Sequence, residues 1–351
     1  MSEDVWSARD TTPSAIEAAL RELLGKRYQV DRTFVPARVM NLIVIVDSGF
    51  RGEVENRLAR VGRYHPSRLV IAAVSEGRTQ LDAWATVAAE DAVHSPGHIA
   101  VGRERIELEI GTQQLDGLDT IVDPLLVPDL TTMVWAPHGH HEGVEALRRL
   151  ANIVLVDTQD DPHLPAAFAR AHDLTHSAYV VDLAWLRSTP WRERVAAIFD
   201  PPAMRRCLGG IERVTVRHRA DSTAAAVLFC GWLATRLTWR PEALGQRGDA
   251  LTGHARAHRG EVTLELRPDE VGAPGLGGVT IDMSSGQSVS LDRGPGGLRS
   301  VRRARDGAEQ AFTVLGASRG EAGILGEGVR QALLRDPTYK PALEAGRVLV
   351  G

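Results

Sequence analysis

The first half of the chain contains two almost uninterrupted apolar runs. They read VMNLIVIV over residues 39–46 and LVIAAV over residues 69–74. Such runs are typical of strands that are buried on both faces of a parallel sheet. Apolar residues at helical spacing, Val54, Leu58 and Val61, lie between the two runs. The order strand, helix, strand therefore predicts two parallel strands joined by a right-handed crossover.

The rest of the first half continues this alternation. We expect strands at residues 131–135 and 152–156, a hairpin at residues 98–101 and 104–110, and helices at residues 12–25, 142–150 and 164–172. Gly25 is expected to end the first of these helices. The polar residues before this first helix predict no regular element. The pattern predicts an α/β domain, residues 1–175, with a mostly parallel, Rossmann-like sheet.

The pattern changes after residue 205, where apolar and polar residues begin to alternate with a period of two. Such alternation, interrupted by Gly, Pro and Ser, predicts an antiparallel sheet with one exposed face. Its strands are expected at residues 211–218, 261–267, 278–283, 288–292, 298–304 and 311–315. Apolar helices are expected at residues 222–237 and 321–334. The second domain, residues 176–351, is therefore predicted as α+β.

The segment at residues 182–200, DLAWLRSTPWRERVAAIFD, carries two tryptophans and a strong helix-start signal. Its Ser188-Thr189-Pro190 sequence offers a capping hydroxyl and then a proline at the first helical position. Four apolar residues follow on one face of a helix: Trp191, Val195, Ile198 and Phe199. We interpret the segment as an amphipathic helix anchored in the core, because it contains no pair of nucleophile and base.

The composition argues against some classes of partner. The 351 residues carry a net charge of −4, whereas nucleic acids and anionic membranes require a clustered positive field. No apolar run approaches the roughly 20 residues of a membrane-spanning helix, and the N-terminus lacks the apolar region of a signal peptide. The two cysteines, Cys207 and Cys230, are too few for a disulfide framework. We therefore expect a cytoplasmic protein.

One loop has the position of a ligand-binding loop. Residues 47–52 follow the first buried strand, and open α/β sheets bind ligands at the carboxyl ends of their strands. The candidate ligand residues in this loop are Asp47, Ser48, Gly49 and Gly52. Backbone N–H groups of the next helix could hold a phosphate, but the loop is not GxGxxG and the chain contains no P-loop motif. A Rossmann-like enzyme or sensor that binds a phosphometabolite or nucleotide is therefore the alternative function.

Two histidine-containing loops are weaker candidates. His65, Ser67 and Arg68 precede the second buried strand, at the edge of a parallel sheet opposite to the usual ligand side, so a structural or interface role is favoured. The other loop carries three histidines: His138, His140 and His141. Their spacing is not that of HExxH, so the sequence predicts at most adventitious metal binding there.

The segment at residues 182–200 resembles the hallmark segment of the glucose-6-phosphate dehydrogenase assembly protein family, OpcA. Other pieces that resemble the family occur in the same order: LIVIVD at 42–47, HPSR at 65–68, TTMVWAP at 131–137, LANIVLVD at 150–157 and GWLATRLTW at 231–239. Together they extend over roughly residues 35–240. The DLAW…TPWR part is specific, whereas HPSR alone is a weak signal.

The resemblance implies a protein that is not an enzyme and has no cofactor. Such a protein binds glucose-6-phosphate dehydrogenase, favours its active oligomer and raises its activity at the entry to the oxidative pentose phosphate pathway. Five residues of the segment become interface candidates: Trp185, Arg187, Trp191, Arg192 and Arg194. We expect Arg192→Glu to weaken partner binding without unfolding the chain. The resemblance is compatible with a homo-oligomer. Redox control through thioredoxin is known in cyanobacterial relatives, but we do not expect it for this chain.

Overall fold

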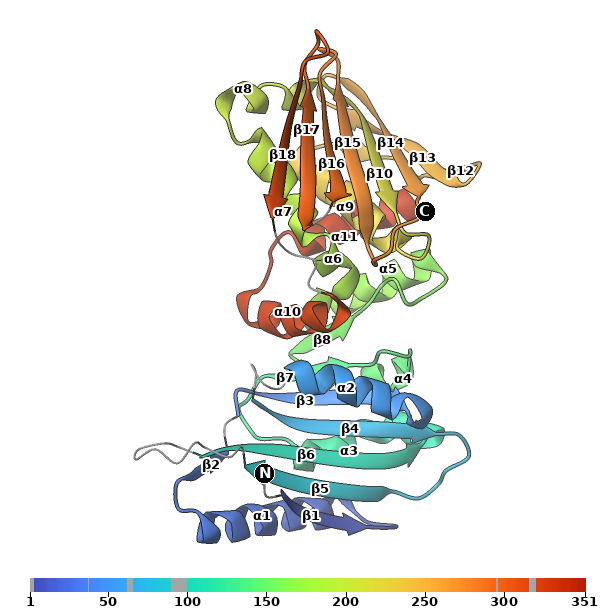
Figure 1. The fold of residues 1–351 in the computed structure, drawn as a ribbon. Helices are drawn as coiled ribbons and strands as arrows, with labels where there is room; N and C mark the ends of the chain where they lie inside the picture. Colours follow the sequence, from blue (N-terminus) through green and yellow to red (C-terminus); the bar gives the residue numbers. More distant parts are fainter. Residues whose placement is uncertain (1–2, 37, 62–65, 90–99, 295, 316–319) are drawn as a thin grey trace. The chain divides into compact units, whose positions relative to one another are not determined.

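The computed structural model describes residues 3–36, 38–61, 66–89, 100–294, 296–315 and 320–351 (Figure 1). The chain divides into two compact units. The first consists of Met1–Val156 and Ser177–Val181, and the second of Asp157–His176 and Asp182–Gly351. The boundary predicted after residue 175 differs from this division, because residues 157–176 belong to the second unit.

A nine-stranded sheet forms the centre of the first unit. Its strands are β1 (Glu3–Ala8), β2 (Phe34–Pro36), β3 (Met40–Asp47), β4 (Ser67–Ser75), β5 (Asp82–Ala89), β6 (Ala100–Gly111), β7 (Thr132–Trp135), β8 (Ile153–Val156) and β9 (Tyr179–Asp182). They follow the order β1-β5-β6-β4-β3-β7-β8-β9, and β2 pairs with β6. The neighbours from β6 through β8 pair in parallel, whereas β5 is antiparallel to both β1 and β6.

The order β6-β4-β3-β7-β8-β9 is that of a Rossmann sheet, with β3 as its first strand. The prediction of a mostly parallel, Rossmann-like sheet is therefore confirmed. Residues Ile43 through Val46 of β3 are completely buried, as expected for a central strand. The strand order reverses between β3 and β7, which is the point where such sheets bind their ligands.

The helices of the first unit are α1 (Pro13–Val30), α2 (Arg51–Val61), α3 (Leu118–Val122) and α4 (His141–Ala146). Short 3-10 turns adjoin them: η1 (Ser48–Phe50), η2 (Thr112–Gly117), η3 (Asp123–Leu125) and η4 (Leu147–Arg149). Helix α1 begins as predicted, because Thr12 accepts a hydrogen bond from Ala15 N at 3.3 Å. The prediction that Gly25 ends it is wrong. The helix continues because its last turn is anchored by the buried Arg27, which pairs with Asp4 of β1 at 3.4 Å.

The hairpin predicted around residue 102 is also wrong, because Ala100–Gly111 is one continuous strand. Gly102 is not a turn residue but allows a close approach: a Cβ there would lie 2.3 Å from the ring of Phe34. Residues 98 and 99 lie outside the described part of the chain. The sequence pattern does not predict β1 and β5, because β1 buries no side chain fully and β5 fills its core positions with Ala83, Ala85 and Val87.

A second nine-stranded sheet forms one layer of the second unit. Its strands are β10 (Ile211–His218), β11 (Arg240–Pro241), β12 (Gly245–Arg247), β13 (Ala250–Ala257), β14 (Gly260–Pro268), β15 (Leu276–Met283), β16 (Ser288–Gly294), β17 (Gly297–Arg303) and β18 (Glu309–Leu315). The order is β11-β13-β14-β10-β15-β16-β17-β18, with β12 paired to β13. The neighbouring strands are antiparallel except β10 and β14, so the predicted α+β class with an antiparallel sheet is confirmed.

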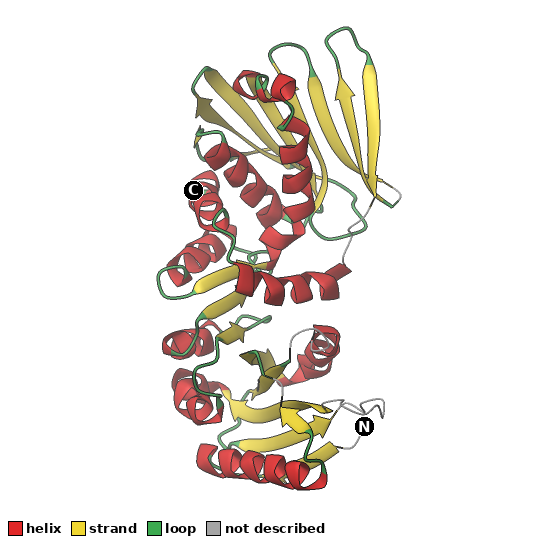
Figure 2. Cartoon of the chain, turned by 90° about the vertical axis from the view of Figure 1, so that its left-hand side faces the viewer, coloured by secondary structure: helices red, strands yellow, loops and turns green. Residues whose placement is uncertain are grey.

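Helices gather on one side of this sheet, and its other face is open (Figure 2). The helices of the second unit are α5 (Leu164–Leu174), α6 (Leu183–Arg187), α7 (Thr189–Phe199), α8 (Pro202–Arg205), α9 (Thr223–Arg236), α10 (Gly320–Leu334) and α11 (Tyr339–Val350), with the 3-10 turn η5 (Leu208–Gly210). The apolar helix α9 packs on β10 and β14. Within the described part of the chain, none of these helices is long and apolar enough to cross a membrane.

Two glycines bring the helices of this layer together. A Cβ at Gly231 of α9 would lie 2.3 Å from Ala342 O, so only glycine lets α11 approach α9 this closely. Gly346 of α11 makes the same kind of close contact with Phe168 of α5. Because α5 packs on α11 in this way, residues 157–176 belong to the second unit although they precede the last strand of the first sheet.

Candidate functional site

The segment at residues 182–200 forms two helices, α6 and α7, rather than one. Asp182 caps α6 by accepting a hydrogen bond from Ala184 N at 3.0 Å. Ser188 joins the helices in a helical conformation, and its hydroxyl donates to Trp185 O at 2.8 Å instead of capping α7. The predicted hydroxyl cap of α7 is therefore wrong. The predicted apolar face is confirmed, because all four of its residues are buried: Trp191, Val195, Ile198 and Phe199.

Arg192 stacks on Trp185 inside the second unit. The guanidinium carbon lies 3.3 Å from the centroid of the indole ring, and Nη1 donates to Trp185 O at 2.7 Å. The indole Nε1 in turn donates to Asp336 Oδ2 at 2.9 Å, and the ring meets Tyr339 edge-on. Burial lowers the pKa of Arg192 to about 9. This stack ties α6 and α7 to the start of α11, which is a structural use of the arginine.

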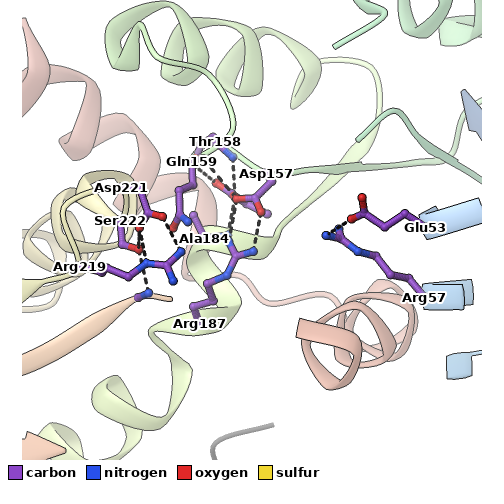
Figure 3. A network of polar contacts seen from close by, with 12 residues as sticks. Glu53, Arg57, Asp157, Thr158, Gln159, Ala184, Arg187, Arg219, Asp221 and Ser222 are labelled. Carbon is purple, nitrogen blue, oxygen red and sulfur yellow. Dashed lines mark hydrogen bonds and ion pairs between the residues drawn. The ribbon is translucent and has the colours of Figure 1, made fainter. Parts of the chain in front are cut away.

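Arg187 and Asp157 form a second buried contact (Figure 3). The two guanidinium nitrogens donate to the two carboxylate oxygens at 2.8 and 2.7 Å, and both side chains are almost completely buried. Such a bidentate pair fixes both partners in one geometry. Figure 3 also shows Arg219, Asp221 and Ser222 as a neighbouring polar group, in which Ser222 accepts a hydrogen bond from Gly275 N at 2.9 Å.

Asp182 lies at the centre of these contacts and is 1% exposed. Its carboxylate accepts hydrogen bonds from Thr158 N at 3.2 Å, Thr158 Oγ1 at 2.8 Å, Tyr339 Oη at 3.1 Å and Ala184 N. Burial, and then repulsion from the Asp157 carboxylate, raise the pKa of Asp182 to about 6. The hydrogen bonds act in the opposite direction but do not outweigh burial. Although perturbed carboxyls often mark active sites, these partners make Asp182 a joint between α6, α11 and residues 157–158.

We expect the stability of the second unit to depend on this carboxyl. An unfolded Asp has a pKa of about 3.9, so between about pH 4 and pH 6 the folded state holds more protons than the unfolded state. The free energy of unfolding should therefore fall as the pH rises through this range, by about 2–3 kcal/mol. Asp182→Asn should remove this pH dependence, since an amide stays neutral and the hydroxyls of Thr158 and Tyr339 can also accept hydrogen bonds.

The measurement is urea denaturation of both proteins at a series of pH values. Relative to Asp182→Asn, the wild type should lose stability between about pH 4 and pH 6.5. A difference between the two proteins that stays constant with pH would contradict the assignment of a raised pKa to Asp182.

The structure corrects the expected interface role of four residues. Trp185, Arg187, Trp191 and Arg192 are internal side chains with exposures of 1–8%, so they are not available for direct contact with a partner. In place of a folded variant we now expect Arg192→Glu to destabilise the chain, because it would put a carboxylate at a buried position near the half-buried Asp336. Arg194 is different: it is half-buried and lies at the edge of a surface hollow. Its interface role stays a prediction.

The predicted ligand loop lies where β3 ends, at the reversal of the strand order. Ser48 and Gly49 belong to η1 and Gly52 to α2, and all three are exposed. Asp47 Oδ1 lies 3.0 Å from His140 Nε2, without the alignment of a hydrogen bond. The ring of Phe50 contacts that of His138 with 4.6 Å between centroids. Side chains from the loops after β3 and β7 thus meet at the position where a Rossmann sheet binds a ligand.

The histidine loop is strained and partly buried. His140 has a left-handed backbone, with φ 42° and ψ 46°, directly before α4. Burial lowers the pKa of His138 and favours its neutral ring. His141 is the first residue of α4 and is exposed. Within the described part of the chain, no three His, Cys, Asp or Glu side chains are arranged to hold a metal ion.

The HPSR loop has a structural role in the residues that the structure describes. Arg68 donates from Nε to Glu104 Oε2 at 2.7 Å and from Nη1 to Leu125 O at 3.0 Å. Arg38 donates to the other oxygen of Glu104 at 2.8 Å, so one buried carboxylate holds two arginines. Ser67 begins β4 and is half-buried. The prediction for His65 lies outside the described residues.

The two cysteines differ in their surroundings. Cys230 is completely buried in α9, and burial raises the pKa of its thiol to about 12, so it behaves as a core side chain. Cys207 is half-buried, with its Sγ 3.5 Å from Ala203 O. Both thiols are free rather than joined in a disulfide.

Several residues of the buried network are not among the candidates that the sequence pattern indicates. One is Asp157, which pairs with Arg187. Two others, Asp336 and Tyr339, contact Trp185. The fourth is Asp182, which accepts a hydrogen bond from Tyr339. One signal is available for Asp157, which directly follows the apolar run of β8. Asp336 and Tyr339 are distant in the sequence, and pattern reasoning within one segment cannot find them.

Two family models match the chain in order. One, described as the N-terminal domain of a glucose-6-phosphate dehydrogenase subunit, matches residues 58–173. The other, described as the C-terminal domain of the same subunit, matches residues 178–343. The two matches together span most of the chain.

Curated cyanobacterial proteins named OxPP cycle protein OpcA are similar in sequence. The protein of Synechococcus elongatus is 30% identical over 181 residues, which are 49% of this chain and 41% of that protein. The protein of Nostoc punctiforme is 30% identical over 142 residues, which are 39% of this chain and 30% of that protein. The matched part thus spans less than half the length of these relatives.

Solved structures are similar in fold. A 3-ketoreductase from Actinomadura kijaniata, determined with TDP-benzene and NADP, has a TM-score of 0.50 at 12% identity, covering 89% of this chain and 95% of that chain. The transcriptional regulator Gal80p from Kluyveromyces lactis has a TM-score of 0.49 at 8% identity, covering 89% of this chain and 88% of that chain. At 12% identity, the similarity to the 3-ketoreductase concerns the fold alone.

Proposed function

We propose that this chain, which belongs to the glucose-6-phosphate dehydrogenase assembly protein (OpcA) family, is a non-catalytic activator of glucose-6-phosphate dehydrogenase. It binds this enzyme in the cytoplasm, favours its active oligomer and so supports the oxidative pentose phosphate pathway. The observation that carries the proposal is the ordered match of both family models over most of the chain. The names of the cyanobacterial relatives support a place in the same cycle.

The chemistry of the hallmark segment supports a role without catalysis. Arg187, Arg192 and Asp182 use their hydrogen bonds on partners inside the second unit. The segment therefore contributes to a rigid scaffold, which a binding protein needs in order to present a fixed surface to its partner.

Activation by binding requires a difference in affinity between two states of the partner. To raise the active oligomer of the dehydrogenase from about a tenth to about nine tenths of the total, the activator must bind it about 80-fold more tightly than the inactive form. This ratio corresponds to about 2.6 kcal/mol. A single well-formed interface can supply such a difference.

The test is a titration of glucose-6-phosphate dehydrogenase from the same organism with this chain, following NADPH formation. We expect kcat/KM to rise and to saturate at a fixed ratio of the two proteins. The chain alone, with glucose 6-phosphate and NADP, should form no NADPH. An unchanged rate throughout the titration would refute activation, and NADPH formed by the chain alone would refute the absence of catalysis.

A second candidate function is binding of a phosphometabolite or nucleotide at residues 47–52. It is favoured by one observation: the loop follows β3 at the reversal of the strand order. Glucose 6-phosphate, 6-phosphogluconolactone and NADP are the ligands to try. The two functions are compatible if such a metabolite adjusts the affinity for the dehydrogenase.

The test of this second function is the melting temperature of the chain with each ligand. The matched variant is Gly49→Val. A Cβ at this position would meet no atom within 4 Å, so the variant should fold normally. A ligand-induced rise in the melting temperature that Gly49→Val abolishes would support the site. A flat result for all three ligands would count against it.

A further inference from the structure

A hollow of about 240 Å³ opens on the helical side of the second sheet. One wall is α7, and the floor and other wall are the last strands, β16 to β18. The lining residues are Arg194, Ala197, Ile198, Leu291, Ser300, Arg302 and Phe312. Figure 1 shows α7 near β18, which ends the strand order of this sheet. The hollow therefore lies at an edge of the sheet.

The strand register explains how the floor forms. Leu291 of β16 lies opposite Ser300 of β17, and Ser300 lies opposite Phe312 of β18. Residues opposite each other in a sheet share one face, so these three side chains form a row that runs toward the edge. Leu291 is covered, with 1% exposure, whereas Phe312 is 53% exposed. Coverage by the helices thus decreases along the row from Leu291 to Phe312, and the side chain of Phe312 lies at the rim of the hollow.

Two buried polar atoms in this hollow have no hydrogen-bond partner among the described residues. The first is Ser300 Oγ, on a residue that is 5% exposed. The second is Arg302 Nε, although Nη2 of the same side chain donates to Ile198 O at 3.3 Å. A buried polar group without a partner destabilises a fold. Both residues line the hollow, so an acceptor that enters it comes close to these two donors.

The lining indicates what kind of group fits. Ala197, Ile198, Leu291 and Phe312 offer apolar contact, and the guanidinium groups of Arg194 and Arg302 offer positive charge. An exposed aromatic side chain next to arginines is typical of the central part of a protein interface. Small-molecule sites are commonly larger, with volumes of about 300–1,000 Å³, and cover most of the ligand. A hollow of this size accepts one large apolar side chain.

We propose that this hollow receives a segment of the partner dehydrogenase that inserts one apolar side chain and places an adjacent carboxylate on Arg194 and Arg302. The carboxylate or a neighbouring carbonyl also accepts the hydrogen bond from Ser300. This assignment rests on the proposed function, since it locates the contact with the same partner. The expected contact surface is therefore no longer the buried residues of the hallmark segment. It is an accessible surface that helix α7 of the same segment helps to form.

The experiment measures the affinity of the 351-residue chain for glucose-6-phosphate dehydrogenase by biolayer interferometry. Three variants change the hollow: Arg194→Glu, Phe312→Asp and Ser300→Ala. The matched control is Arg240→Glu, an exposed arginine on β11 at the opposite end of the strand order. Thermal melting checks that every variant is folded. Ser300→Ala removes a polar group without a partner and should not lower the melting temperature.

We expect Arg194→Glu and Phe312→Asp to weaken binding at least 10-fold, Ser300→Ala to weaken it several-fold, and Arg240→Glu to change it less than 2-fold. If the wild type binds and the hollow variants bind equally well, the docking assignment is overturned while the proposed function stands. If the wild type does not bind the dehydrogenase, both are overturned. If the hollow variants abolish only self-association of the chain, the occupant is a second copy, and the assignment to the dehydrogenase is again overturned.

Discussion

Trp185→Ala should lower the free energy of unfolding by about 4–5 kcal/mol, since truncation of a buried tryptophan costs about 3–5 kcal/mol before any polar contact is counted. The side chain is 2% exposed. Its removal also takes away the surface on which Arg192 stacks and the N–H that Asp336 accepts. The variant therefore leaves a cavity and removes contacts of the buried Arg192 and the half-buried Asp336.

The measurement is urea denaturation followed by circular dichroism. Trp185→Phe is the matched control, because it keeps a ring under Arg192 and loses the hydrogen bond to Asp336. We expect this control to lose about 1–2 kcal/mol. A loss of less than about 2 kcal/mol in Trp185→Ala would mean that the site collapses around the cavity, and it would contradict the view of the tryptophan as a central anchor.

Asp157→Ala should destabilise the chain by about 3–5 kcal/mol, because it removes the bidentate carboxylate from a buried arginine. Arg187 donates to both oxygens of Asp157, and its side chain is almost completely buried. The loss should be visible as a lower urea midpoint at neutral pH.

The double variant Asp157→Ala with Arg187→Met tests whether the two side chains stabilise the fold as a pair. Replacement of a buried ion pair by apolar groups is often tolerated, whereas removal of one partner is not. We therefore expect the double variant to be more stable than Asp157→Ala, with a coupling of about 2 kcal/mol or more between the sites. Additive losses would show that the two side chains stabilise the fold independently.

The layered architecture of both units can be predicted from local patterns. Strand β3 is buried on both faces and reads as an apolar run, and the alternation of apolar and polar residues predicts β10 over its full length, residues 211–218. These elements are determined by the side chains they bury, and burial leaves a period in the sequence. Strands that carry a weak period, such as β1 with no fully buried residue, cannot be predicted in this way.

Other errors have a tertiary origin. Gly25 has the residue type that ends helices, but α1 continues to Val30, and Arg27 in this added turn is buried and pairs with Asp4 of β1. Gly102 resembles a turn residue, but it accommodates the ring of Phe34 within a strand. In each case a contact between distant residues overrides the local preference.

The candidate site is the least predictable part. Arginines at positions 187 and 192 have the composition of an interface, and only the fold reveals that their partners are Asp157 and Trp185 within the same unit. The surface hollow depends on the register of β16, β17 and β18 against α7. No single segment of the sequence contains that register, so Ser300 and Phe312 carry no local signal.

The most direct test of the proposed function is sedimentation velocity of the chain mixed with glucose-6-phosphate dehydrogenase from the same organism. At about 10 µM of each protein, a complex with a Kd of about 1 µM or lower would be mostly formed. We expect a species that contains both proteins and sediments faster than either alone, together with a larger share of the active oligomer. Two boundaries that remain unchanged from those of the separate proteins would contradict it.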